Sequence, residues 1–302
     1  MKTVSLQILV AMVAGFIGSS AVASIVVTQT TDGPTLASAL AGTGLSSVTA
    51  TVNAGNSAQF GTYTGFNQGP LTLPNGIVMS TGEVVQTPES YAEPLSYPQI
   101  STDFGDGSTA EYTAYATGRV TNFGSAHDVA SLTIQFDLAA SSAVTFNWAF
   151  GSVEYPNFTS EFTDAVFAFL DGTNASNQIL YDASNNPVQV GNSFASALIT
   201  DDQNTAFAGT HGIIGLTTTT GLLAPGIHTL TFEIGDTNDG ALDSAIFVGP
   251  ISTTNAIGTG PVTVATNAPD ACSTACLLGV SLLGLVAIKR KMGANGPVAN
   301  LA

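Results

Sequence analysis

The densest group of side chains able to do chemistry lies in the segment 236–243, which reads Asp-Thr-Asn-Asp-Gly-Ala-Leu-Asp. Carboxylate and amide oxygens in a glycine-containing loop suit a hard cation such as calcium, which takes about 6 to 8 oxygen ligands. The segment is not an EF-hand, because Gly240 comes one position early and Phe247 stands where the last ligand, a glutamate, belongs. The alternative is an Asx-rich turn whose side chains cap backbone N–H groups.

Other residues that could carry catalysis are sparse. No His-x-x-x-His, Gly-x-Ser-x-Gly or Gly-x-x-x-x-Gly-Lys motif occurs. His228 shares strand parity with Leu230 and Phe232, which predicts a position at the edge of the core. Glu154 and Asp164 could form a glycosidase pair, but an acidic β-protein offers such pairs by chance. We therefore expect no enzymatic activity.

Charge is concentrated in a way that excludes several partners. Only 9% of the 302 residues are charged, well below the roughly 25% of ordinary soluble domains. Residues 24–267 contain 20 Asp and Glu but a single Lys or Arg, Arg119. Such a body is a poor partner for nucleic acid. Its charge must be hydrated, screened by salt or neutralised by bound cations.

Both ends of the chain have the composition of targeting segments. Residues 1–23 combine Lys2, an apolar stretch and Ala21-Val22-Ala23, which predicts a secretory signal peptide cleaved between Ala23 and Ser24. An uncleaved membrane anchor is the alternative. At the other end, the apolar run 271–288 is long enough for a short transmembrane helix. Three cations follow it and place the final residues, 292–302, inside the cell; they are Lys289, Arg290 and Lys291. A buried core helix is the alternative for the run.

The C-terminal layout also resembles a known sorting signal. The sequence Ala-Pro-Asp-Ala-Cys at 268–272, the apolar run and the basic cluster are similar to a PEP-CTERM-type signal of the Val-Pro-Asp-Ser-Gly variant. The resemblance implies that an exosortase-type membrane enzyme recognises Pro269 and Asp270 and sorts the protein to the cell surface. The two cysteines, Cys272 and Cys276, lie in this tail, either as apolar fillers or as sites of modification.

The body between the two ends is patterned as strands. Leu132, Ile134, Phe136 and Leu138 alternate with polar residues, as do the apolar residues of 144–150 and 230–234. The segment 165–170 is apolar on both parities, which predicts a central strand covered on both faces. One short helix is expected over 34–41, capped by Asp32 and ended by Gly42. The pattern predicts an all-β, antiparallel, jelly-roll-like β-sandwich over 24–251, followed by a linker over 252–268. A β-solenoid is the alternative, although no period recurs.

The body carries a second resemblance, to the bacterial choice-of-anchor L domain. Four elements of the family occur in order. The first two are Gly-Ile-Val-Met-Ser-Thr-Gly at 76–82 and Phe-Gly-Ser-Val-Glu-Tyr at 150–155. The last two are Asp-Ala-Val-Phe-Ala-Phe-Leu at 164–170 and the segment 234–248, which begins Ile-Gly-Asp and ends Leu-Asp-Ser-Ala-Ile-Phe-Val. Val153 replaces the first of two family glutamates. Within this frame the expected calcium ligands come from neighbouring strands and the acidic loop, and they are Glu154, Asp164, Asp236, Asp239 and Asp243.

Together these features predict an exported bacterial protein, anchored in the membrane by its C-terminal helix during sorting and then held at the cell surface. We expect a structural or adhesive role in the extracellular matrix, with calcium as a stabilising ion. One alternative is a calcium-dependent carbohydrate-binding module for extracellular polysaccharide, in which aromatic residues stack on sugars; the candidates are Tyr63, Phe66, Tyr91, Tyr97, Tyr112 and Tyr115. We favour the simpler reading, in which these aromatics close the ends of the sandwich. A glycoside-active enzyme is the more distant alternative.

Overall fold

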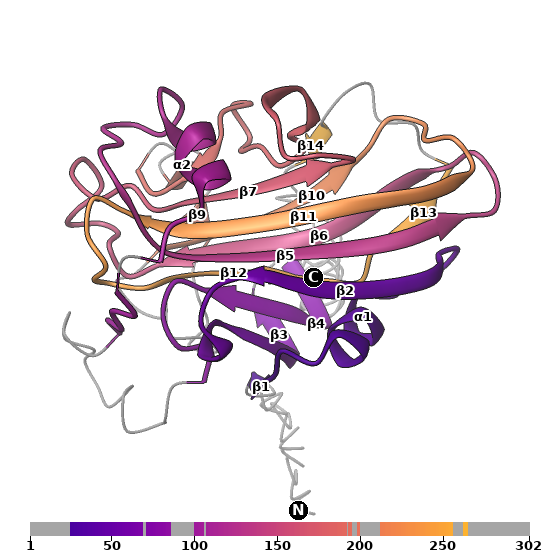
Figure 1. Ribbon diagram of the computed structural model, residues 1–302, viewed down its shortest axis with the longest axis horizontal. Coiled ribbons are helices and arrows are strands. Elements are labelled where there is room, and N and C mark those ends of the chain that lie inside the picture. Colours follow the sequence, from indigo (N-terminus) through magenta and orange to yellow (C-terminus); the bar gives the residue numbers. More distant parts are fainter. Residues whose placement is uncertain are drawn as a thin grey trace, which may run out of the picture.

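Figure 1 shows a computed structural model of the chain, which describes residues 25–68, 71–85, 100–105, 107–191, 193–194, 198–199, 212–255 and 262–264. The predicted signal peptide, the sorting signal with its transmembrane helix, and the tail 292–302 lie outside the described residues. Among the helices that are described, none has the length and apolar character needed to cross a bilayer.

The described strands form two sheets, and every strand pair is antiparallel. The larger sheet has nine strands, with the order β1-β3-β4-β12-β6-β10-β14, while β13 also pairs with β6 and β9 with β10. Its strands are β1 (Val26–Gln29), β3 (Phe60–Gln68), β4 (Leu71–Ser80), β6 (Ala143–Ser152), β9 (Leu198–Ile199), β10 (Gly212–Thr219), β12 (Ser244–Val248), β13 (Ser252–Thr254) and β14 (Val262–Val264). The smaller sheet has the order β2-β5-β11-β7-β8. Its strands are β2 (Ser46–Ala54), β5 (Ala126–Leu138), β7 (Ala165–Leu170), β8 (Val188–Gln189) and β11 (Gly226–Thr237). The prediction of an antiparallel sandwich is confirmed.

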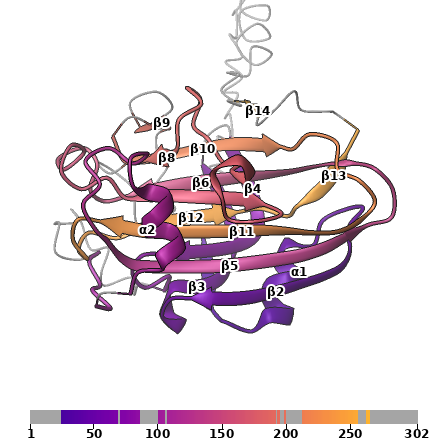
Figure 2. The ribbon, with the colours of Figure 1, turned by 45° about the horizontal axis from the view of Figure 1, so that its top comes forward.

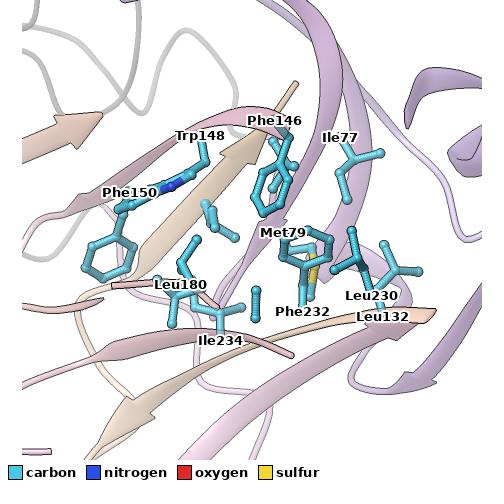
Figure 3. Close-up of a cluster of buried hydrophobic side chains, with 14 of the residues drawn as sticks. Ile77, Met79, Leu132, Phe146, Trp148, Phe150, Leu180, Leu230, Phe232 and Ile234 are labelled. Carbon is cyan, nitrogen blue, oxygen red and sulfur yellow. The ribbon is translucent and has the colours of Figure 1, made fainter. Parts of the chain in front are cut away.

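The main core lies between the two sheets, and the alternating strands supply it. Leu132 of β5 pairs with Phe232 of β11, and both side chains are fully buried on the inner face. From the larger sheet, Phe146 meets Phe232 edge to face, with ring centroids 5.5 Å apart. Trp148, the only tryptophan, lies in the same cluster (Figure 3). Apolar residues therefore recur at every second position in each of these strands, because one face of the strand enters this core.

Strand β7 is buried on both faces and pairs with a strand on each side, β11 and β8, as its sequence predicts. Val166 and Ala168 face the main core, while Phe167 and Phe169 face a second cluster on the outside of the smaller sheet. A helix that the sequence analysis missed, α2 (Ala110–Ala116), covers that outer face (Figure 2). The double burial of β7 thus comes from a helix laid over it.

The aromatic candidates for sugar stacking are mostly internal. Tyr112 and Tyr115 of α2 pack on Phe167, with ring centroids 5.3 and 4.7 Å away. Tyr63 and Phe66 pack against Phe247 on the outer side of the larger sheet and are buried. The sugar-stacking alternative is wrong for these four residues, because each of them covers the outer face of a sheet. Tyr91 and Tyr97 lie outside the described residues.

The expected short helix is present as α1 (Gly33–Leu40), at the edge between the sheets. The Asp32 carboxylate accepts a hydrogen bond from the Thr35 backbone N–H at 3.0 Å, and Pro34 occupies the first turn. Leu36 and Leu40 enter the main core. The described residues also include two 3₁₀ turns, Ser57–Gln59 and Ala175–Asn177.

A buried acidic cluster as the candidate functional site

The register of both sheets brings four segments to one end of the sandwich. In the larger sheet the last residue of β6, Ser152, pairs with the first residue of β12, Ser244. In the smaller sheet the first residue of β7, Ala165, pairs with Gly235 near the end of β11. Side chains just beyond these positions therefore meet at the same end, although they are far apart in the sequence.

Three carboxyl groups converge there without contact with solvent. Glu154 follows β6, Asp164 directly precedes β7, and Asp236 is the last residue but one of β11. Each of the three side chains is 0% exposed. The Asp164 backbone N–H points at the Glu154 carboxylate, with an N···Oε2 distance of 3.5 Å. Burial, and then repulsion from the neighbouring Asp164 carboxylate, raise the pKa of Asp236. We call Glu154, Asp164 and Asp236 the acidic cluster.

The two remaining predicted ligands border this cluster. Asp239, half-buried in the turn after β11, lies within electrostatic reach of Glu154 and Asp164. Asp243, 1% exposed, precedes β12 and acts on Asp236 in the same way. Its carboxylate accepts a hydrogen bond from the Thr102 backbone N–H at 2.8 Å. The structure thus brings all five predicted residues to one end of the fold.

Asp164 links the two sheets through hydrogen bonds. The Thr237 backbone N–H donates to its Oδ1 at 3.0 Å, and the Ser244 hydroxyl donates to its Oδ2 at 2.6 Å. Thr237 belongs to β11 of the smaller sheet and Ser244 to β12 of the larger one. Both oxygens of Asp164 are therefore satisfied and its orientation is set.

Other oxygens of the cluster have no donor. Five buried carboxylate oxygens in the described part of the chain lack a hydrogen-bond partner, and four of them belong to the candidate residues. They are Glu154 Oε1, Asp236 Oδ1, Asp236 Oδ2 and Asp239 Oδ1. The Thr81 hydroxyl lies beside Asp236 and lowers its pKa. That hydroxyl is engaged with Ser244, accepting from the Ser244 N–H at 2.9 Å and facing its carbonyl oxygen at 3.4 Å.

The electrostatic balance of the cluster is unfavourable for three negative charges. Burial is the main cause that raises the pKa of Glu154, Asp164 and Asp236, and repulsion between the carboxylates adds to it. Arg119, the lone cation of the body, lies elsewhere: its guanidinium stacks on Tyr115 at 4.5 Å and donates to the Tyr115 hydroxyl at 2.8 Å. The cluster therefore lacks the cationic partner that buried carboxylates normally have.

Sequence analysis missed two contributors to this end of the fold. Asp128, near the start of β5, is 2% exposed and raises the pKa of Asp243. A polar residue before the apolar run of β5 was the only signal for it. Gly82 is the second: a side-chain carbon there would lie 1.8 Å from Asp243 Oδ2. Only glycine leaves room for the Asp243 carboxylate.

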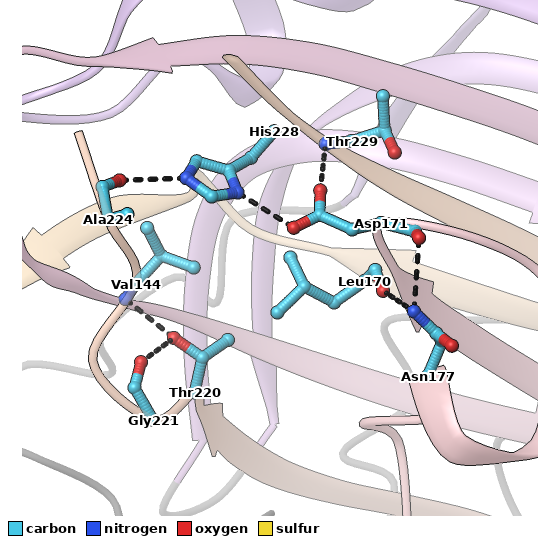
Figure 4. A network of polar contacts seen from close by, with 9 residues as sticks. All are labelled: Val144, Leu170, Asp171, Asn177, Thr220, Gly221, Ala224, His228 and Thr229. Carbon is cyan, nitrogen blue, oxygen red and sulfur yellow. Dashed lines mark hydrogen bonds and ion pairs between the residues drawn. The ribbon is translucent and has the colours of Figure 1, made fainter. Parts of the chain in front are cut away.

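The opposite end of the smaller sheet holds a different polar network (Figure 4). His228 at the start of β11 contacts Asp171 Oδ2 through Nδ1 and the Ala224 carbonyl through Nε2, both at 2.8 Å. Asp171 also accepts from the Thr229 N–H at 2.9 Å. The His228 ring lies 5.9 Å from that of Phe136, at the core edge as predicted. This network joins β7 to β11.

As the side chains stand, no set of three or more His, Cys, Asp or Glu in the described part of the chain is close enough to hold a metal ion.

Comparison with known proteins gives one match. No curated protein and no solved structure matches the chain. The family model described as "Choice-of-anchor L domain" matches residues 26–254, most of the chain and nearly all of its described residues. The chain therefore belongs to the choice-of-anchor L domain family.

Proposed function

We infer that this chain is an exported protein of the cell surface, because its body belongs to the choice-of-anchor L domain family. We propose that this chain is a non-catalytic structural or adhesive component of the extracellular matrix, stabilised by calcium. One observation carries the proposal: the carboxyl groups best suited to chemistry, Glu154 and Asp164, are sealed inside the sandwich. Asp164 joins the two sheets through hydrogen bonds. The polar chemistry of the site thus supports the architecture.

Attachment to the cell is part of the same proposal. The signal peptide directs export, and the segment 271–288 with its three following cations holds the chain in the membrane until an exosortase-type enzyme processes it. Substituting Pro269 and Asp270 by alanine should move the chain out of the surface fraction. A full-length chain recovered from the cytosol with both termini intact would overturn the proposal.

The matrix role has its own test. Cells lacking this protein should form a matrix with lower cohesion, measured as resistance to shear. Cells expressing the full chain should regain it, whereas cells expressing the Pro269→Ala, Asp270→Ala chain should not. Unchanged cohesion in the deleted strain would count against a structural or adhesive role.

Carbohydrate binding is a second candidate with less support. Four of the six aromatic candidates are buried and so cannot stack on a sugar. A glycan array probed with and without calcium tests it, since the proposed structural role requires no calcium-dependent signal there.

A glycosidase is the more distant candidate. Its buried pair, Glu154 and Asp164, would need a cleft that admits a sugar ring. Turnover of a polysaccharide that is abolished by Glu154→Gln would revive that reading.

A further inference from the structure

The acidic cluster holds more negative charge than its protein surroundings can stabilise. Asp236 is 0% exposed, and neither of its carboxylate oxygens accepts a hydrogen bond. Glu154, equally buried, has one oxygen without a donor. Transfer of an ionised carboxylate from water to such a site is strongly unfavourable unless a proton or a cation compensates it. The unpartnered oxygens identify the position where the compensating group must lie.

We propose that one calcium ion binds at this end of the sandwich, with Glu154, Asp164 and Asp236 as its carboxylate ligands and Asp239 at its solvent side. The inference rests on the proposed function in one respect only, that the chain works outside the cell. Extracellular calcium modules bind with dissociation constants of about 10⁻⁴–10⁻³ M. A site of that affinity fills after export and remains empty in the cytosol.

The donor chemistry favours calcium over other cations. Every candidate ligand is an oxygen, and neither cysteine nor histidine belongs to the acidic cluster, whereas zinc prefers nitrogen and sulfur. The ligands come from a loop after β6, a residue before β7 and the end of β11, which gives an irregular set. Calcium accepts irregular geometry at about 2.3–2.6 Å and adds waters or carbonyls, while magnesium demands a compact octahedron.

The spacing of the side chains is consistent with a site that closes around its ion. As the side chains stand, no three carboxylates of the described residues lie within ligand distance of one point. Hydrogen bonds fix Asp164 to both sheets, whereas Glu154 Oε1 and both carboxylate oxygens of Asp236 have no donor. Calcium binding requires rotation of the Glu154 and Asp236 carboxylates toward Asp164. The ion would then connect β6 of the larger sheet to β7 and β11 of the smaller one.

The experiment is a calcium titration of the full chain in detergent after removal of metals with EDTA, at pH 7.5. We expect one calcium per chain by calorimetry. At about 100-fold excess over the dissociation constant, the melting temperature should rise by about 5–10 °C. Magnesium chloride at the same concentration should give a much smaller rise. Wild-type protein that binds no calcium up to several millimolar, or melts identically in calcium and EDTA, overturns the proposal.

Asp236→Asn keeps the shape of the side chain and removes one charge. We expect it to weaken calcium binding at least tenfold and also to melt above the wild type in EDTA, because the uncompensated charge is gone. This opposite pair of effects separates ligand loss from a folding defect. The matched control, Glu161→Gln, neutralises an exposed carboxylate outside the cluster and should behave as the wild type. Full calcium binding by Asp236→Asn refutes the ligand assignment.

Should Asp236→Asn fail to fold in both conditions, Glu154→Gln provides the same comparison, with the same two expected effects. Fractionation distinguishes this inference from the proposed function. A chain that reaches the cell surface but ignores calcium refutes only the metal site. A chain that binds calcium in detergent but stays in the cytosol refutes only the surface role.

Discussion

Glu233 is a buried carboxylate outside the acidic cluster, and it allows the energetic cost of such a group to be measured alone. It lies opposite Ser131 of β5 and Phe167 of β7, on the outer face of the smaller sheet. Its side chain is 2% exposed. The Ser131 hydroxyl donates to Oε1 at 3.1 Å, and Oε2 has no partner. Replacement by glutamine keeps the acceptor for Ser131 and stands in for the protonated acid.

The sign of the effect follows from the pKa of Glu233. Burial raises it from 4.5 to about 7, the Ser131 hydrogen bond opposes the rise, and Glu111 nearby adds to it. The folded state therefore holds the proton more tightly than the unfolded state. The stabilisation by this proton is fully present below pH 4.5 and is lost as the pH rises to about 7. Between pH 5 and pH 8 the loss amounts to about 2–3 kcal/mol.

Glu233→Gln should thus gain about 2–3 kcal/mol over the wild type between pH 5 and pH 8. Urea unfolding followed by the fluorescence of Trp148, the single and fully buried tryptophan, measures the difference at each pH. Other titrating groups are common to both proteins and cancel. Glu161→Gln, an exposed replacement, should show no such gain. A gap between variant and wild type that is equal at the two pH values would refute the reasoning.

Three further perturbations test other parts of the structure. Asp171→Asn removes a carboxylate that contacts His228. Burial lowers the pKa of His228, but its hydrogen bonds to Ala224 and Asp171 outweigh burial and raise the pKa above 6.5. The loss of melting temperature should therefore be greatest below pH 6.5 and should shrink as the pH rises through the raised pKa. Tyr112→Phe removes a buried hydroxyl that donates to two main-chain carbonyls, and urea unfolding should show a loss of about 1–2 kcal/mol, whereas an unchanged midpoint would contradict those bonds. Phe232→Ala opens a cavity between the sheets and should cost about 3–5 kcal/mol in the same assay; a cost below 1 kcal/mol would place this ring outside the core.

The strands were predictable where one physical requirement acts on them. In β5 and β11 one face enters the core and the other does not, so apolar and polar residues alternate. Strand β7 was recognised as doubly buried, but its second cover was not. That cover, α2, has only seven residues, and its buried positions Tyr112, Tyr115 and Ala116 lie within little more than one turn. The apolar stripe of this helix is short and lies in a stretch rich in glycine and threonine. From the sequence alone, such a pattern cannot be distinguished from a loop.

The acidic site was predictable in its residue types more than in its energetics. The segment 236–243 shows a concentration of oxygen donors in the sequence itself. Whether a carboxylate is exposed or buried depends on packing against residues far away in the sequence. The sequence of the loop therefore does not predict its burial. Asp243, for example, is buried because Gly82, from a distant strand end, leaves space for it. Burial turns an ordinary acidic turn into a site with charge to compensate.

The segments that carry the family resemblance meet at this site. The first, 76–82, contributes Thr81 and Gly82; the second contributes Glu154 and the third Asp164; the fourth contributes Asp236. Elsewhere the fold needs only hydrophobic residues of suitable size on alternating positions, which many sequences supply. At this end of the sandwich, buried carboxylates without a cationic partner pack against a glycine and a threonine hydroxyl. Few other residues could replace these without disturbing the packing. The four segments of this chain that resemble the family are therefore the ones that build the buried acidic cluster, and we expect the function of this chain to depend on whatever neutralises that charge.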